Sequence, residues 1–188
     1  YTVTETQPAG YLDGRDELGN AGGKWSTDRF TGIRVGPTTE AADYNFGELR
    51  PATISGSVFA DKDEGGTRGP TELGIPGVKV RLTGRTDLGG VVNRAIRTGP
   101  EGDYSFAGLR PGTYTLTETQ PTRFKDGPEA VGTAGGATVR NDKVSEIPLG
   151  SGTTATGYNF AETPIADVAV RLNLSAAKVV AGSIVTLT

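Results

Sequence analysis

The stretch Tyr114-Thr-Leu-Thr-Glu-Thr-Gln-Pro121 occurs almost unchanged as Tyr1-Thr-Val-Thr-Glu-Thr-Gln-Pro8, 113 positions earlier. Within this stretch apolar and polar side chains alternate, which is the pattern of a β-strand with one buried face. A second pair of motifs, Tyr44-Asn-Phe-Gly-Glu48 and Tyr158-Asn-Phe-Ala-Glu162, stands 114 positions apart. Two pairs of motifs in nearly the same register indicate an internal repeat.

The register of this repeat predicts three parts of a tandem array. Residues 1–50 are expected to be the second half of one repeat, and residues 51–163 one complete repeat. Residues 164–188 begin differently and are expected to be the first strands of a following Ig-like domain. The incomplete parts cannot bury their apolar faces alone. They are therefore expected to be completed by another chain or to pair with each other.

The complete repeat is predicted to consist of short strands. Alternation is clear at residues 54–59, 78–82, 104–106 and 114–118, whereas residues 91–96 and 138–144 give weaker signals and residues 158–160 close the unit. Turns rich in Gly and Pro separate these segments, and no long stretch has helical periodicity. About seven short strands in roughly 110 residues are typical of an all-β sandwich with Ig-like architecture.

Composition excludes several classes of function. The 188 residues include no Cys, His or Met, so disulfides, Cys/His zinc sites and catalysis by Cys or His are excluded. A net charge of −3 without a basic patch argues against nucleic-acid binding. No run of apolar residues approaches the length of about 18 that a membrane-spanning helix needs. A chain free of cysteine is compatible with a bacterial surface protein.

The acidic segment Asp61-Lys-Asp-Glu-Gly-Gly-Thr-Arg-Gly-Pro-Thr-Glu72 has the spacing of a calcium loop of EF-hand type. Asp61 and Asp63 stand at positions 1 and 3, and Glu72 stands at position 12. A glycine occupies position 6, where such loops turn sharply, and Thr67 at position 7 would offer its backbone carbonyl.

One position of this loop departs from the pattern. Position 5 is Gly65 instead of Asp or Asn, so water or an inward-turned Glu64 would complete the ligand shell. We expect a dissociation constant in the extracellular range, about 10⁻⁴ to 10⁻³ M. The alternative is an acidic, Gly-rich surface turn without metal.

The ordered motifs resemble a known family. Ile54-Ser-Gly-Ser-Val-Phe-Ala-Asp61, Gly102-Asp-Tyr-Ser-Phe106 and Leu109-Arg-Pro-Gly-Thr-Tyr114 are similar to the B-type repeats of staphylococcal serine-aspartate surface proteins and of collagen adhesins. The resemblance implies an Ig-like or prealbumin-like antiparallel β-sandwich that serves as an extracellular stalk. It also implies that bound Ca²⁺ stiffens the repeats.

Collagen-adhesin B-type domains often carry a Lys–Asn isopeptide crosslink beside a buried Glu, and the resemblance puts Glu118 and Asn159 at two of the three positions. Residues 54–59 contain no lysine, because Lys62 lies in the acidic loop and Lys79 on a later strand. We therefore expect no crosslink, and we expect Glu118 and Asn159 to make local hydrogen bonds.

Several other polar and aromatic groups are open to more than one interpretation. The pair Glu101 and Asp103 is interpreted as a solvated turn, although paired carboxylates also occur in glycosidases and metal sites. The tyrosines at strand-periodic positions are expected in the core, whereas Trp25 could stack on a sugar ring. A further acidic cluster lies in a Gly-rich loop at Asp13, Asp16 and Glu17, with Asp126 and Glu129 as its counterpart, and it is a weaker metal candidate.

The sequence thus predicts a non-enzymatic spacer in an extracellular bacterial adhesin or surface filament, stiffened by calcium. Its partners would be neighbouring domains or identical chains at the cell surface. The alternative is a ligand- or carbohydrate-binding sandwich of a secreted adhesin or enzyme. An exposed aromatic platform would favour that alternative.

Overall fold

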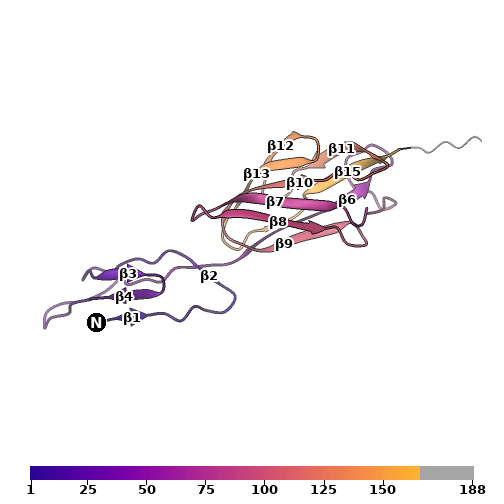
Figure 1. Cartoon of the computed structure of the whole chain (residues 1–188). Coiled ribbons are helices and arrows are strands. Elements are labelled where there is room, and N and C mark those ends of the chain that lie inside the picture. The colour runs from indigo at the N-terminus through magenta and orange to yellow at the C-terminus, as the bar shows by residue number, and fades with distance from the viewer. Residues whose placement is uncertain (166–188) are drawn as a thin grey trace, which may run out of the picture.

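The structure, a computed structural model, describes residues 1–165; the predicted following domain, apart from its first two residues, lies outside them. Every regular element of this part is a β-strand, which confirms the all-β prediction (Figure 1). No helix in it is long and apolar enough to cross a membrane. Residues 1–50 contain β1 (Val3–Thr4), β2 (Leu12–Asp13), β3 (Lys24–Ser26), β4 (Arg29–Thr31) and β5 (Glu48–Leu49).

The later strands form a sandwich. They are β6 (Ala52–Ala60), β7 (Lys79–Thr86), β8 (Val91–Arg97), β9 (Asp103–Leu109), β10 (Gly112–Glu118), β11 (Phe124–Ala130), β12 (Ala137–Arg140), β13 (Lys143–Leu149), β14 (Thr154–Ala155) and β15 (Asn159–Pro164). One sheet has the order β12-β13-β10-β7-β8, and the other has the order β11-β15-β6-β14 with β9 paired to β6. The ladders are antiparallel except that β6 pairs in parallel with β14 and β15. A parallel pair needs a long crossover, and here almost the whole domain separates the first strand from the last.

Alternation along the strands puts the core between the two sheets. On β10, which lies between β13 and β7, Tyr114 and Leu116 are fully buried, whereas Thr113 is exposed. Burying each large apolar side chain contributes about 1.5–3 kcal/mol. The fully buried larger apolar side chains of the sandwich are Ile54, Val58, Phe59, Val80, Leu82, Phe106, Tyr114, Leu116, Val144, Ile147, Tyr158 and Phe160.

The tyrosine prediction is confirmed for the complete repeat. Tyr104, Tyr114 and Tyr158 are buried, and each hydroxyl donates to a backbone carbonyl at 2.6–2.8 Å. In the first part the prediction is wrong for Tyr1, which is 80% exposed. Tyr44 is half-buried, and its hydroxyl donates to the Gly22 carbonyl as that of Tyr158 does to Gly135.

Two strand predictions need correction. The segment 124–130 forms β11, although its sequence contains Gly127, Pro128 and three charged residues that weaken a strand signal. Pairing with β15, with a register shift between Asp126 and Glu129, overrides that weak propensity. The single strand expected at residues 138–144 is instead the hairpin β12–β13, because Asp142 turns the chain with φ of 62°.

Residues 1–50 reproduce the pairing of the second half of the sandwich. Val3 pairs with Phe30 as Leu116 pairs with Val144, and Asp13 pairs with Glu48 as Asp126 pairs with Glu162. Figure 1 shows this part lying beyond one end of the sandwich and running into it through β6. The local strand pairing of the repeat therefore forms in both copies.

Candidate metal centre

The predicted calcium loop connects β6 to β7, and its first ligand, Asp61, directly follows β6. The Asp61 side chain is fully buried. Its Oδ1 accepts a hydrogen bond from the Gly65 amide at 3.1 Å, and its Oδ2 accepts one from the Gly66 amide at 2.8 Å. Gly66 adopts φ of 69°, a conformation that glycine tolerates best, so the loop turns sharply where position 6 of the pattern requires it.

Glu72 brings the other end of the loop back to its start. It is 6% exposed, and its two carboxylate oxygens accept from the amides of Lys62 at 2.7 Å and Gly69 at 2.8 Å. Asp61, Asp63 and Glu72 each offer an oxygen within 4.8 Å of the others. Two oxygens bound to opposite sides of one Ca²⁺ lie at most about 5 Å apart, so this hard-oxygen set fits a common calcium ion.

Glu64, the fourth predicted carboxylate, is not part of this group. Glu64 is exposed, has φ of 57°, and lines a surface hollow beside Lys125 and Pro128. Thr67 is also exposed. Arg68 reaches across the loop, donating to the Glu72 carbonyl at 3.3 Å and pairing with Asp103 at 3.6 Å. The structure thus groups three of the four predicted carboxylates, Asp61, Asp63 and Glu72.

The candidate crosslink residues lie in different surroundings. Asn159 Oδ1 accepts from the Ser57 amide at 3.0 Å and from its hydroxyl at 3.2 Å, as expected for local bonding. Glu118 is 3% exposed, and neither of its carboxylate oxygens has a hydrogen-bond donor, so the expectation of local bonding is wrong for this residue. Lys62 and Lys79 are both exposed.

The remaining carboxylates separate into an exposed turn and a half-buried group. Glu101 and Asp103 lie at an exposed turn before and at the start of β9, and Asp103 pairs with Arg68. Asp126 and Glu129, by contrast, lie near Asp142. The sequence analysis missed Asp142 and its counterpart Asp28 as members of such groups. The signal was present, since the same carboxylate recurs at matched positions of the repeat.

Comparison with known proteins identifies the domain type. The sequence model of the SdrD B-like domain matches residues 52–156. The chain belongs to this family. Over 125 residues it is 31% identical to serine-aspartate repeat-containing protein F of Staphylococcus epidermidis and 30% identical to protein D of Staphylococcus aureus strain Newman. These alignments cover 66% of this chain but only 7% and 9% of those proteins, so the chain spans less than a tenth of their length.

Solved structures also show similarity to the chain. The shaft pilin SpaA of Lactobacillus rhamnosus GG has a TM-score of 0.38 at 10% identity, covering 62% of this chain and 52% of the pilin. The minor pilin GBS52 of Streptococcus agalactiae has a TM-score of 0.38 at 14% identity, covering 76% of this chain and 61% of that one. Family membership itself confirms the resemblance found in the sequence, and the domain is of an extracellular, cell-surface type.

Proposed function

We propose that this chain is a non-enzymatic spacer of a bacterial surface protein, built from tandem B-type repeats and stiffened by calcium. Residues 1–50 would be the second half of one repeat, residues 51–163 a complete repeat, and residues 164–188 the start of a further domain. The observation that carries the proposal is the short connection between the two copies. Only Arg50 and Pro51 stand between β5 and β6, and so short a linker containing proline limits bending.

Contacts at this connection support a fixed orientation of the two copies. Arg110 donates to the Asp13 carbonyl of the first copy at 2.7 Å and forms two hydrogen bonds with Asp87 of the second, at 2.9 and 3.1 Å. The Arg50 guanidinium lies 5.9 Å from the centre of the Tyr11 ring. The Arg50 amide donates to the Ser151 hydroxyl, and the Arg50 carbonyl accepts from the Gly152 amide, each at 2.8 Å.

Calcium at the β6–β7 loop would add stiffness within the complete copy. The ion would be held by Asp61, Asp63 and Glu72, and it would offset the repulsion among carboxylates that the fold forces together. Because the loop begins at the buried end of β6, ordering the loop also fixes the strand that leads from the connection into the core.

A ligand-binding module is the second candidate, since Trp25 is 65% exposed. Within residues 52–165, however, every Tyr and Phe is buried or half-buried, so the complete copy presents no aromatic platform. This distribution favours the spacer. Matrix or host ligands of the whole surface protein are outside this proposal.

The loop is tested by recording the amide signals of Gly65 and Gly66 by nuclear magnetic resonance during a calcium titration of the full chain. We expect both signals to shift in the wild type and to stay unchanged in the D61N/E72Q variant. The thermal midpoint of the wild type should rise with calcium. At a calcium concentration a hundredfold above the dissociation constant, the free energy of unfolding should increase by about 3 kcal/mol.

The E101Q variant, which alters an exposed carboxylate outside the loop, is the matched control and should respond as the wild type does. Unchanged Gly65 and Gly66 signals in wild-type protein at 10 mM calcium would rule out the loop site.

A further inference from the structure

The outer face of the β12-β13-β10-β7-β8 sheet collects positive charge that is scattered in the sequence. Along β7, Lys79, Arg81 and Arg85 are exposed at positions that alternate with core side chains. Arg97 of β8 pairs with Lys79, and Lys143 of β13 lies in the cross-strand row of Arg81, on the far side of β10. These five cations form the basic sheet face. The expectation that the chain has no basic patch is therefore wrong, because only the sheet brings these residues together.

No acidic side chain shares the outward positions of β7, β8 and β10. The two ion pairs found among the described residues involve Arg68 and Arg110 instead. The positive charge of the basic sheet face is therefore not offset by carboxylates on these three strands. Besides the cations, their outward positions carry short polar or small apolar residues: Thr83, Val91, Asn93, Ala95, Thr113, Thr115 and Thr117.

Two cations of this face stand directly opposite each other, since Lys79 pairs with Arg97 on the neighbouring strand. Like charges in such a cross-strand pair are destabilising. Neutral acceptors orient the guanidinium groups: Arg97 donates to the Gly77 carbonyl at 2.6 Å, and Arg81 donates to Asn93 Oδ1 at 2.9 Å. A guanidinium has five N–H donors, so both arginines retain donors for an anion.

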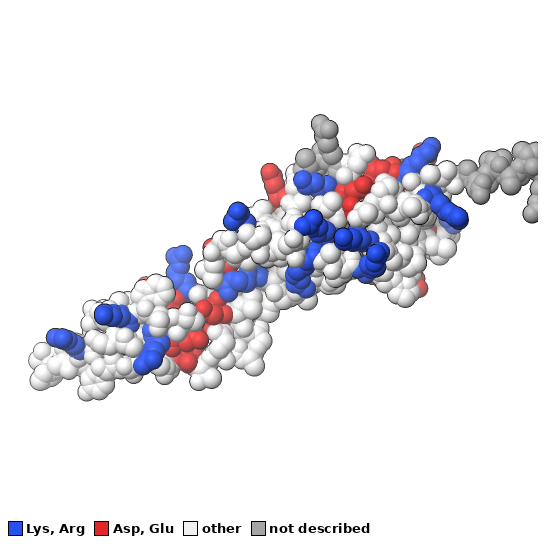
Figure 2. Space-filling view, viewed as in Figure 1, with Lys and Arg blue, Asp and Glu red and all other residues white. Residues whose placement is uncertain are grey.

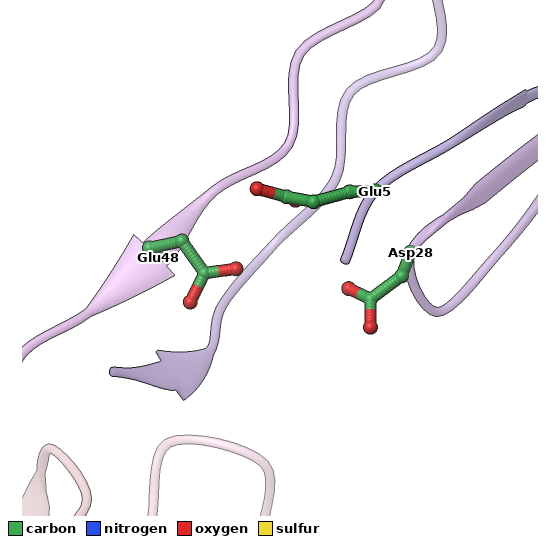
Figure 3. A group of neighbouring side chains, drawn as sticks. All are labelled: Glu5, Asp28 and Glu48. Atoms are coloured by element: carbon green, nitrogen blue, oxygen red, sulfur yellow. The ribbon is translucent and has the colours of Figure 1, made fainter. Parts of the chain in front are cut away.

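The carboxylate clusters of the chain turn toward one another and not toward this face. Glu118, Asp142 and Glu162 are buried or half-buried and offer oxygens within 4.8 Å of one another. Figure 2 shows Lys and Arg side chains gathered over the part of the sandwich where Figure 1 places β7 and β8. Buried clusters are poor partners for an exposed cation, so a second copy of the chain is not the favoured partner. Figure 3 shows the corresponding cluster of the first copy, formed by the half-buried Glu5, Asp28 and Glu48.

We propose that the basic sheet face binds a linear sulfated polysaccharide. The charge of the face is complementary to such a polymer, and the rigid fork of arginine matches the paired oxygens of an oxyanion. The threonine hydroxyls and the Asn93 amide between the cations can hydrogen-bond to sugar hydroxyls. This activity goes beyond the spacer role and does not depend on calcium.

The spacing of the cations fits an extended polymer. Outward side chains two residues apart on one strand are separated by about 6.6 Å, so the row from Lys79 to Arg85 covers about 20 Å. A surface hollow lies at each end of this row. Arg85 lines one hollow with Asn93, and Lys79 and Arg97 line the other. A polymer that follows β7 would therefore meet a cation at both ends and others between them.

The breadth of the face disfavours double-stranded nucleic acid as the partner. Five strands spaced by about 4.8 Å extend over about 19 Å. The major groove of DNA is about 12 Å wide and admits a helix or a two-stranded ribbon. The face could contact only the phosphates of a duplex, and its threonine and asparagine side chains would lie outside the grooves.

The test is isothermal titration calorimetry of the full chain with a size-defined heparin oligosaccharide, at an ionic strength of about 0.15 M. The K79Q/R81Q/R97Q variant should bind heparin about tenfold or more weakly than the wild type, because three exposed charge contacts are lost. The K24Q/R29Q/R34Q variant removes three exposed cations from the first copy and has the same net charge. This matched control should bind heparin as the wild type does, and desulfated heparin should bind weakly to all three proteins.

Two further measurements separate binding from folding. The melting midpoint of K79Q/R81Q/R97Q should stay close to that of the wild type, because the opposed pair of cations is removed. In the wild type, heparin should shift the amide signals of Asn93 and Thr115 in nuclear magnetic resonance spectra. The D61N/E72Q variant should bind heparin normally, so failure of the calcium loop and failure of this face are distinguishable.

Three results would overturn the proposal. The first is equal heparin affinity in the wild type and K79Q/R81Q/R97Q. The second is a set of heparin-induced shifts confined to residues outside β7, β8 and β10. The third is tighter binding of a DNA duplex than of heparin, which would make nucleic acid the partner.

Discussion

Replacing Glu118 by Gln should stabilise the metal-free protein, although the side chain is buried. The folded-state pKa of Glu118 is about 9, against 4.5 for an ordinary Glu. Between these values the folded protein holds a proton that the unfolded chain has released. Stability from this group is therefore fully present below about pH 4.5 and is lost as pH rises toward 9.

The size of the effect follows from the same values. The interval from the ordinary pKa of 4.5 to pH 7 spans about 2.5 pH units, and each unit corresponds to about 1.4 kcal/mol. At pH 7 Glu118 therefore lowers the free energy of unfolding by about 3 kcal/mol. Gln does not ionise, and its amide can donate to the unpartnered oxygens of Asp142 and Glu162. For a domain of this size, 3 kcal/mol corresponds to a rise in the midpoint of about 10 °C.

The assay is thermal unfolding by circular dichroism in chelator at pH 4, 5, 6, 7 and 8. The E118Q variant should match the wild type at pH 4 and exceed it increasingly as pH rises. A variant that is less stable than the wild type in chelator at pH 7, or a difference independent of pH, would refute the electrostatic reasoning about Glu118, Glu162, Asp126, Glu129 and Asp142.

Three further predictions concern the fold and the connection. Leu116→Ala should lower the free energy of unfolding in urea by about 2–5 kcal/mol, equally in calcium and chelator, since it opens a cavity in the core without touching a carboxylate; a loss below about 1 kcal/mol would contradict this. Gly56→Ala should abolish cooperative melting, because a Cβ there would lie 1.7 Å from the Tyr158 carbonyl oxygen. Gly99→Ala, whose Cβ would come no nearer than 3.7 Å to the Asp103 carbonyl oxygen, should melt cooperatively. Arg110→Ala should change the free energy of unfolding by about 1 kcal/mol or less, yet it should broaden the pair-distance distribution obtained from small-angle scattering. An unchanged distribution would argue against the Arg110 contacts as a restraint on the orientation of the two copies.

The strands that carry clear alternation could be predicted from sequence because their apolar side chains enter one core. Residues 54–59 and 114–118 lie within β6 and β10, for example. β11 could not be predicted, since its Gly and Pro become acceptable only through pairing with β15. The β12–β13 turn could not be predicted, because Asp142 adopts a left-handed conformation that the polar sequence around it does not indicate.

The two carboxylate groups also differed in how far they could be predicted from the sequence. The loop of Asp61 and Glu72 is local in sequence, so its spacing alone indicated a site. The group around Glu118 gathers side chains up to 44 positions apart, and only the sheet pairing brings them together. Glu118 was noticed for a different reason, the resemblance to crosslinked domains. Its neighbours in space, Asp142 and Glu162, are not its neighbours in the chain.

The central claim, that calcium stiffens the tandem repeat, is tested most directly by measuring distances between the two copies. The chain has no cysteine, so W25C and V91C, at positions 65% and 74% exposed in the wild type, would accept two unique spin labels. Double electron–electron resonance on the full chain should give a narrow distance distribution in calcium and a markedly broader one in chelator. Distributions of equal width under the two conditions would contradict the claim.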